Sequence, residues 1–219
     1  MKFTQNILFL LFLILLILIP PIYTGMRYLF LAKNSSEDAT ASHYYEKAAI
    51  FLFWRNDLYE KAGILEKHDP ARAINLLQKS RNRGSLSPAG QLYLGDAYQS
   101  SAQTGLAIAE WETLYQNSQE LTRVCPRLAT IYHAQAQFIH EMDILKKWLS
   151  LEPQNPDANQ SMGILLAADA KKEAVEYLQR TADQSATSAL RLRRLISALS
   201  DSNEDEAYRL TRSAQALAD

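Results

Sequence analysis

Small residues recur along the middle of the chain at intervals of 32 to 34 positions. The first column of this pattern holds Gly63, Gly95, Ala129 and Gly163. A second column, ten to twelve positions later, holds Ala73, Ala107, Glu141 and Ala174, and further members of its set follow after four and seven positions. Spacings of i, i+4 and i+7 place each set on one face of a helix. The pattern therefore predicts a series of units, each made of two amphipathic helices, at residues 56–87, 88–121, 122–155 and 156–188.

A period of this length is typical of stacked helical hairpins, and the residues resemble the tetratricopeptide repeat (TPR), a helix-turn-helix unit of about 34 residues. The signature places of that family are occupied within 88–121 by Leu94, Gly95, Tyr98, Ala107 and Trp111, and within 122–155 by Leu128, Ala129, Tyr132 and Pro153. The chain departs from the family at Glu141, where alanine is preferred, at Gln91 and Asn159, where tryptophan is preferred, and at Glu66, where an aromatic is preferred. The resemblance implies an all-α fold, a right-handed α-solenoid of TPR hairpins, from roughly Asn56 to Ser188.

The chain opens with an apolar segment that suggests a membrane anchor. An uninterrupted apolar run reaches from Ile7 to Ile19, and Pro20, Pro21, Ile22 and Tyr23 follow it. These 17 residues give roughly 25 Å of helix, the short end of what crosses a bilayer. A cleaved signal peptide is the alternative, but Tyr23-Thr24-Gly25 is a poor cleavage site. We therefore expect an uncleaved anchor at 1–33 with a transmembrane helix at about 7–23.

The orientation of this anchor is nearly balanced. Lys2 favours an N-terminus inside the cell, whereas Arg27 and Lys33 favour the opposite. Because Lys2 lies so close to the apolar run, we expect the repeats on the extracytoplasmic side, which in a bacterium is the outer side of the inner membrane.

The segments on either side of the repeats have weaker patterns. Polar residues at Lys33–Thr40 predict a loop, and the spacing of Ala41, Tyr45 and Ala48 predicts the second helix of a degenerate repeat. The front half of that repeat would merge with Tyr28–Ala32, so 34–55 is predicted to hold a linker and a half repeat. After the repeats, 189–219 is predicted to form capping helices, because Leu190–Leu199 and Ala207–Leu217 are both amphipathic.

Composition and motifs argue against several classes of function. A net charge of −1 disfavours a nucleic-acid surface or a polybasic membrane patch. The single Cys125 excludes an internal disulfide framework and is expected to be a buried thiol. His133 and His140, with Glu141 and Asp143, lack the compact spacing of metal ligands. No Gly-x-Ser-x-Gly and no Gly-rich phosphate loop is present. We expect no enzyme, no catalytic residue, no cofactor and no metal.

A TPR stack offers a concave groove lined mainly by the first helices of its hairpins. The candidate groove residues are the first-helix residues not used in the packing columns. They are Asp57, Glu60, Ile64, Leu92, Asp96, Gln99, Arg123, Thr130, His133, Gln160, Ile164 and Ala167. Arg123 is the only lysine or arginine among them, which disfavours the carboxylate clamp of chaperone-binding family members. Asp96 and Arg123 are opposite charges on successive first helices and are the leading candidates for partner contact.

These features predict a membrane-anchored protein–protein interaction module, a scaffold or an accessory subunit of a membrane protein assembly. The expected partners are proteins, together with the bilayer through the N-terminal helix, and no nucleic acid or small-molecule substrate. The layout also resembles anchored TPR factors of the secretion translocon, which handle exported clients as chaperones. A stoichiometric partner in a pull-down favours the first interpretation, and many substoichiometric partners favour the second.

Overall fold

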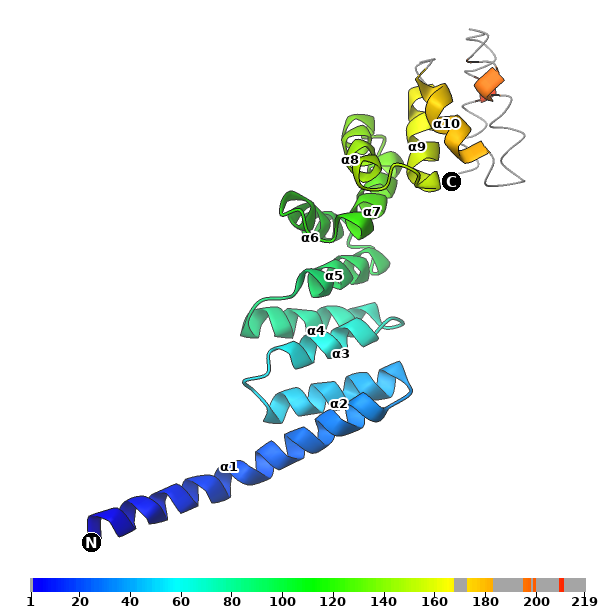
Figure 1. The fold of residues 1–219 in the computed structure, drawn as a ribbon. Coiled ribbons are helices and arrows are strands. Elements are labelled where there is room, and N and C mark those ends of the chain that lie inside the picture. Colours follow the sequence, from blue (N-terminus) through cyan, green and yellow to red (C-terminus); the bar gives the residue numbers. More distant parts are fainter. Residues whose placement is uncertain (1, 168–172, 183–194, 198, 200–208, 211–219) are drawn as a thin grey trace. The chain divides into compact units, whose positions relative to one another are not determined.

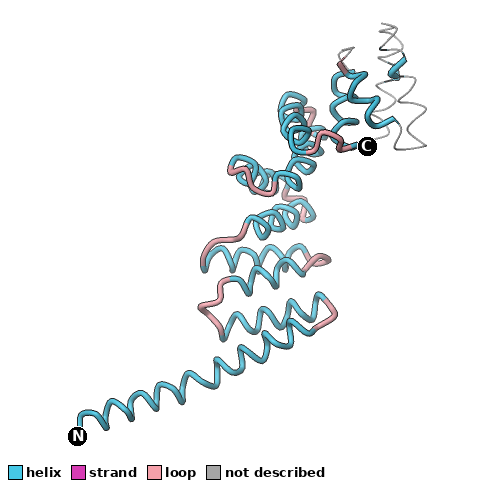
Figure 2. The backbone as a smooth tube through the Cα atoms, in the orientation of Figure 1, coloured by secondary structure: helices cyan, strands magenta, loops and turns pink. Residues whose placement is uncertain are grey.

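The computed structural model describes residues 2–167, 173–182, 195–197, 199 and 209–210, and the side chains of 2–15, 181 and 182 are outside this description. In this part of the chain all regular structure is helical, and short turns connect the helices (Figures 1 and 2). The helices are α1 Lys2–Asn34, α2 Asp38–Phe51, α3 Asp57–Leu65, α4 Pro70–Arg83, α5 Pro88–Ser100, α6 Thr104–Gln116, α7 Leu121–Ala134, α8 Phe138–Leu151, α9 Pro156–Ala167 and α10 Ala174–Ala182. The all-α prediction is therefore confirmed.

The chain divides into two compact units, Met1–Gln119 and Glu120–Asp219. In the first unit, α1 packs on α2, α3 on α4 and α5 on α6, and α2–α3 and α4–α5 contacts join these hairpins. In the second unit, α7 packs on α8 and α9 on α10, and α8 also contacts α9. Within each unit every helix therefore packs on its neighbours in sequence, which is the arrangement of an α-solenoid.

Local sequence signals explain where several helices begin. Asp69 and Ser87 each accept a hydrogen bond from the backbone N–H three residues later, at 2.9 and 3.0 Å. Asn155 does the same for Ala158 at 3.1 Å. Each of these polar residues is followed by a proline, which lacks an N–H and is pre-set for the first helical position. A cap followed by proline therefore starts α4, α5 and α9.

The small-residue column lies where the two helices of a hairpin approach each other. A Cβ added to Gly95 would lie only 2.7 Å from Cδ1 of Trp111, and one added to Gly63 would lie 2.7 Å from Cγ of Leu77. Both distances are too short for a real methyl group, so only glycine allows these contacts. Gly95 therefore lies at a close approach of α5 and α6.

The N-terminal part differs from the predicted boundaries. Helix α1 runs through Pro20 and Pro21 and ends at Asn34, and α2 begins at Asp38. The loop expected at Lys33–Thr40 is therefore only three residues long, because Glu37 and Asp38 start a new helix directly. Leu29 of α1 shares a buried core with Ala48 and Leu52.

Among the described residues, no helix is long and apolar enough to cross a membrane. The transmembrane helix expected at about 7–23 is thus not supported and stays a prediction. Of the predicted capping segment 189–219, most lies outside the described residues, but Leu195 and Leu199 pack in one buried cluster with Leu178 of α10.

Candidate protein-binding site

A cavity of about 360 Å³ lies between α7, α8 and α9 in the second unit. These helices are coloured green to yellow in Figure 1. Its apolar wall includes Pro126, Ala129, Trp148 and Ile164. Its polar lining consists of Thr130, His133, Glu141, Asp157, Gln160 and Ser161. A mainly apolar hollow with a few converging polar groups is the usual form of a binding site.

The charged group that is buried in this cavity is the carboxylate of Glu141, which is only 2% exposed. Its two oxygens lie 3.1 and 3.0 Å from Nδ1 of His133. His133 lies in the last turn of α7 and Glu141 in the first turn of α8. The connection at Gln135–Gln137 therefore brings the two side chains together. That connection is tight because Ala136 adopts a left-handed conformation, with φ of 54°. Gln135–Gln137 therefore forms the short loop between α7 and α8.

The cavity is acidic. Burial raises the pKa of Glu141 above its ordinary value, and the hydrogen bond with His133 partly opposes this effect. Asp157, in the first turn of α9, adds a second carboxylate to the lining. Of the described residues that line the cavity, none is a lysine or arginine. A positively charged group is therefore the electrostatic complement of this hollow.

Hydrogen bonds hold the aromatic wall in place. The indole N–H of Trp148 donates to a carboxylate oxygen of Glu152 at 2.9 Å. Asn155 donates to the same oxygen at 2.7 Å and also caps α9 through Ala158. The turn between α8 and α9 thereby fixes both the indole and the start of the helix that carries Asp157 and Gln160. The aromatic wall is therefore held by hydrogen bonds within the chain.

Four of the predicted groove residues line this cavity: Thr130, His133, Gln160 and Ile164. Thr130 is exposed, and its hydroxyl donates to the carbonyl of Pro126 at 2.8 Å. Arg123 was also predicted but is absent from the lining, and its Nη1 lies 3.3 Å from Oε2 of Glu120 at the start of α7. Ala167 is buried completely in the core, so its prediction as a groove residue is wrong.

In the first unit, two predicted groove residues hold turns in place. Asp57 pairs with Arg55 and Lys61, each at 2.8 Å, and the hydrogen bond from Arg55 keeps the pKa of Asp57 well below its usual range. Glu60 accepts hydrogen bonds from the hydroxyl and, at 3.1 Å, from the backbone N–H of Ser87 at the start of α5. The carboxylates of Asp57 and Glu60 therefore stabilise the fold through contacts within the chain.

The other predictions in this unit have mixed outcomes. Leu92 is fully buried, because α5 packs on both α4 and α6, and its prediction as a groove residue is wrong. Ile64 and Asp96 line a smaller cleft of about 150 Å³, and Gln99 is exposed at the end of α5. Asp96 belongs to the first unit and Arg123 to the second, and their joint contact with a partner stays a prediction.

Other chemistry-bearing residues are accounted for by packing. Cys125 is fully buried, as the sequence predicted, and burial raises its pKa to about 11. The ring of His140 packs against Tyr132, with centroids 5.4 Å apart. Throughout the described stretches, no group of three or more His, Cys, Asp and Glu side chains could hold a metal ion.

The residues that sequence reasoning missed are Glu141, Trp148, Asp157 and Ser161. The sequence held one signal, for Glu141, because this residue occupies a column that otherwise holds alanine. The sequence alone did not show that this departure faces a cavity.

Comparison of the chain with protein-family models finds no match, and comparison with curated proteins finds none either.

Proposed function

We propose that this protein is a membrane-anchored interaction module of TPR-like hairpins that serves as a scaffold or accessory subunit of a membrane protein assembly. The observation that carries the proposal is the cavity between α7, α8 and α9. Thr130 and His133 come from one first helix and Gln160 from the next, and all three line the same hollow. This is the arrangement by which a helical-hairpin stack presents its first helices to a partner.

The cavity suits one or two side chains of a partner, because about 360 Å³ is small for a peptide segment. A lysine or arginine fits best. The carboxylates of Glu141 and Asp157 supply negative charge, and the indole of Trp148 supplies an aromatic wall. Cations bind favourably over an indole, and the contact strengthens where water is excluded. The partner is therefore a protein that inserts a basic side chain between α7, α8 and α9.

Membrane anchoring is the second part of the proposal. The apolar run from Ile7 to Ile19 supports it, and so do the large exposed side chains of Leu16 to Ile19, at 47 to 68%. Water-exposed apolar residues in an unbroken run are unfavourable unless lipid or protein covers them. The proposed site of action is the extracytoplasmic side of the inner membrane.

The test is to fill the cavity and follow the partner. Full-length tagged protein would be extracted from its own cells in mild detergent, and co-purifying proteins would be quantified by mass spectrometry. Thr130→Trp places a large side chain at the mouth of the cavity. Thr113→Trp is the matched control, because Thr113 is also exposed on a helix and also bonds the carbonyl four residues earlier at 2.8 Å.

We expect wild type and Thr113→Trp to recover the same stoichiometric partner, and Thr130→Trp to recover at least about tenfold less. Loss of a desolvated charged contact weakens binding by about 2–5 kcal/mol, which exceeds a factor of ten. Unchanged recovery with Thr130→Trp at unchanged helicity would reject this cavity as the binding site. Many substoichiometric partners would instead favour a client-handling factor.

A further inference from the structure

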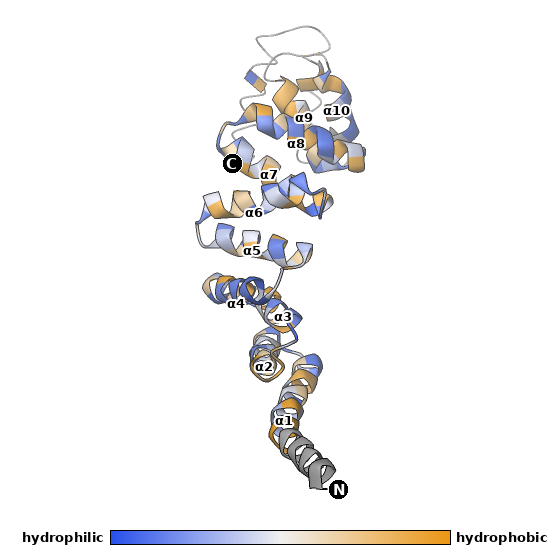
Figure 3. Cartoon of the chain, turned by 90° about the vertical axis from the view of Figure 1, so that its left-hand side faces the viewer, coloured by the Kyte–Doolittle hydropathy of each residue, from blue (hydrophilic) through white to orange (hydrophobic). Residues whose placement is uncertain are grey.

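Large apolar side chains are exposed mainly at one end of the first unit. They lie on α1, at the end of α2 and in the turn from α2 to α3. In Figure 3, several turns in the coloured part of α1 are hydrophobic. The members are Leu16, Ile17, Leu18, Ile19, Ile22, Tyr23, Met26, Phe30, Ile50, Phe53 and Trp54. An apolar surface of this extent marks a contact with lipid or with protein.

The distribution around α1 favours lipid. Consecutive helical residues point about 100° apart, so Leu16 to Ile19 cover all sides of the helix, and all four are exposed. A protein groove would cover one stripe of such a helix and leave the remaining sides in water. A helix that is apolar on every side is surrounded by an apolar medium. The bilayer is the medium that meets this requirement.

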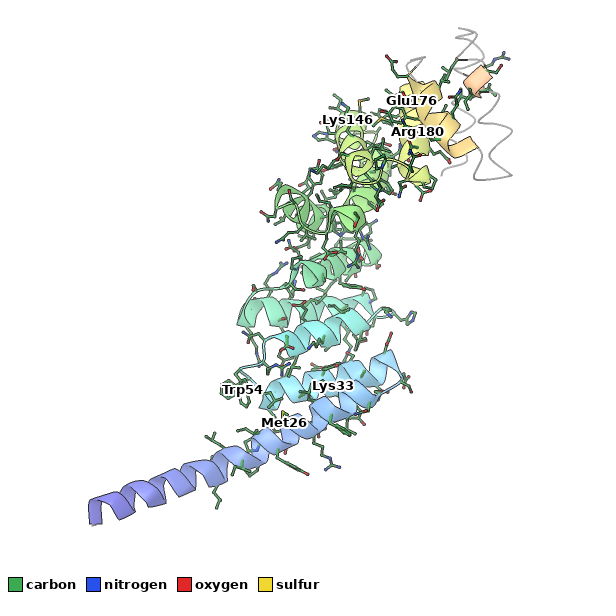
Figure 4. The ribbon with its side chains drawn as sticks, in the orientation of Figure 1. Met26, Lys33, Trp54, Lys146, Glu176 and Arg180 are labelled. Carbon is green, nitrogen blue, oxygen red and sulfur yellow. The ribbon has the colours of Figure 1, made fainter. Side chains whose placement is uncertain are left out.

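The turn after α2 lies beside the point where α1 joins the first unit. The buried stripe of α1 comprises Gly25, Leu29 and Ala32. Gly25 is in close contact with the end of α2, since a Cβ there would lie 2.6 Å from Cγ of Leu52. Leu52 is itself only 1% exposed, so it fixes the turn against α1 at this level. In Figure 4, Met26 and Trp54 lie toward the same end of the α1–α2 hairpin.

The next two residues of this turn face outward. Phe53 is 68% exposed and Trp54 51% exposed, and their rings pack edge to face with centroids 5.2 Å apart. Tyr23 and Met26 of α1 are exposed near the same level. Arg55, which follows, pairs with Asp57 at 2.8 Å and so marks the polar side of the turn. Aromatic rings between an apolar segment and charged residues are typical of the membrane–water interface.

We propose that Phe53 and Trp54 enter the bilayer interface beside α1 and give the first unit a second contact with lipid. The inference rests on the proposed membrane anchoring and adds to it. One helix alone leaves the attached domain free to rotate about its exit point. A second contact at the α2–α3 turn holds the first unit at a defined tilt to the membrane surface.

Tryptophan fluorescence of the full-length protein in phosphatidylcholine vesicles tests this directly. The chain has three tryptophans, and Trp111 and Trp148 are only 2% and 7% exposed, so lipid can reach Trp54 alone. Vesicles would contain lipids brominated either high or low on the acyl chain, because bromine quenches a nearby indole. The matched control is Trp54→Leu, which keeps the turn apolar. Flotation of the vesicles would verify attachment in the same samples.

We expect wild-type emission to shift to shorter wavelength in vesicles and to be quenched more by high than by low bromines. Trp54→Leu should show neither effect. Protein that floats with vesicles but is not quenched would overturn the inference and leave the anchor standing. Protein that does not float would overturn both. Shielding of Trp54 that requires an added protein extract, without quenching by brominated lipid, would assign the surface to a protein partner and also overturn the inference.

Discussion

The hairpins α5–α6 and α7–α8 share one framework but use the same position differently. At the start of the second helix, α6 has Ala107 and α8 has Glu141, and both are almost completely buried. Thirty-four residues separate them, as they separate Gln99 from His133 on the first helices. In α7–α8 the buried carboxylate meets His133 and lines a cavity. In α5–α6 the equivalent place is apolar.

The difference between Ala107 and Glu141 distinguishes a residue that serves packing from one that is proposed to serve binding. Replacing an alanine by a buried carboxylate is unfavourable for folding unless a partner compensates the lost hydration. His133 compensates part of it, yet the pKa of Glu141 remains raised because burial dominates. A group that weakens the fold and lines a hollow is a candidate for ligand binding. The α7–α8 hairpin is therefore the one of the pair that carries the proposed binding site.

The largest expected effect comes from copying the carboxylate into the ordinary hairpin. Ala107→Glu would bury a carboxylate opposite Gln99, which has no imidazole to pair with it. We expect the free energy of unfolding to fall by about 3–5 kcal/mol, as for an uncompensated buried charge. Urea denaturation followed by circular dichroism measures it.

Ala109→Glu is the control for this change, because Ala109 is exposed on the same helix. It should change stability by no more than about 0.5 kcal/mol. Equal stabilities of the two variants would show that α6 does not bury position 107. The contrast drawn between the α5–α6 and α7–α8 hairpins would then be wrong.

A smaller effect is expected from neutralising the natural carboxylate with Glu141→Gln. Because the folded-state pKa of Glu141 is raised, the folded protein binds more protons than the unfolded chain, and the wild type loses stability as pH rises above about 4. The glutamine variant lacks this loss. Its stability relative to wild type should increase from about pH 4 to neutral pH.

Urea midpoints of both proteins across this range provide the measurement. A difference that stays constant with pH would mean that burial does not raise the pKa of Glu141. It would also remove the electrostatic distinction between the two hairpins.

The helical framework could be predicted because it depends on local and periodic features. The column of Gly63, Gly95 and Gly163 places glycine where a Cβ would collide with the second helix, so its spacing reports the hairpins directly. The short α1–α2 turn was missed because polar residues such as Glu37 and Asp38 suit a loop and a first helical turn equally well.

The site could be predicted only in part. Periodicity identified Thr130 and Gln160 as non-packing residues, and both line the cavity. Leu92 was misassigned because a first helix also packs on the preceding hairpin, which periodicity within one hairpin does not reveal. The pairing of His133 with Glu141 depends on the left-handed turn at Ala136. Alanine rarely adopts this conformation, so the sequence does not indicate it. The cavity itself needs α9 to pack on α8.

The central claim is that the partner contacts the hollow between α7, α8 and α9 rather than the first helices of the first unit. Site-specific photo-crosslinking in intact cells tests it most directly. A photoreactive phenylalanine derivative would replace Gln160, which lines the cavity, or Gln99, the exposed groove candidate on α5. We expect one crosslinked partner band from position 160 and none from position 99. A partner crosslinked from position 99 and not from position 160 would contradict it.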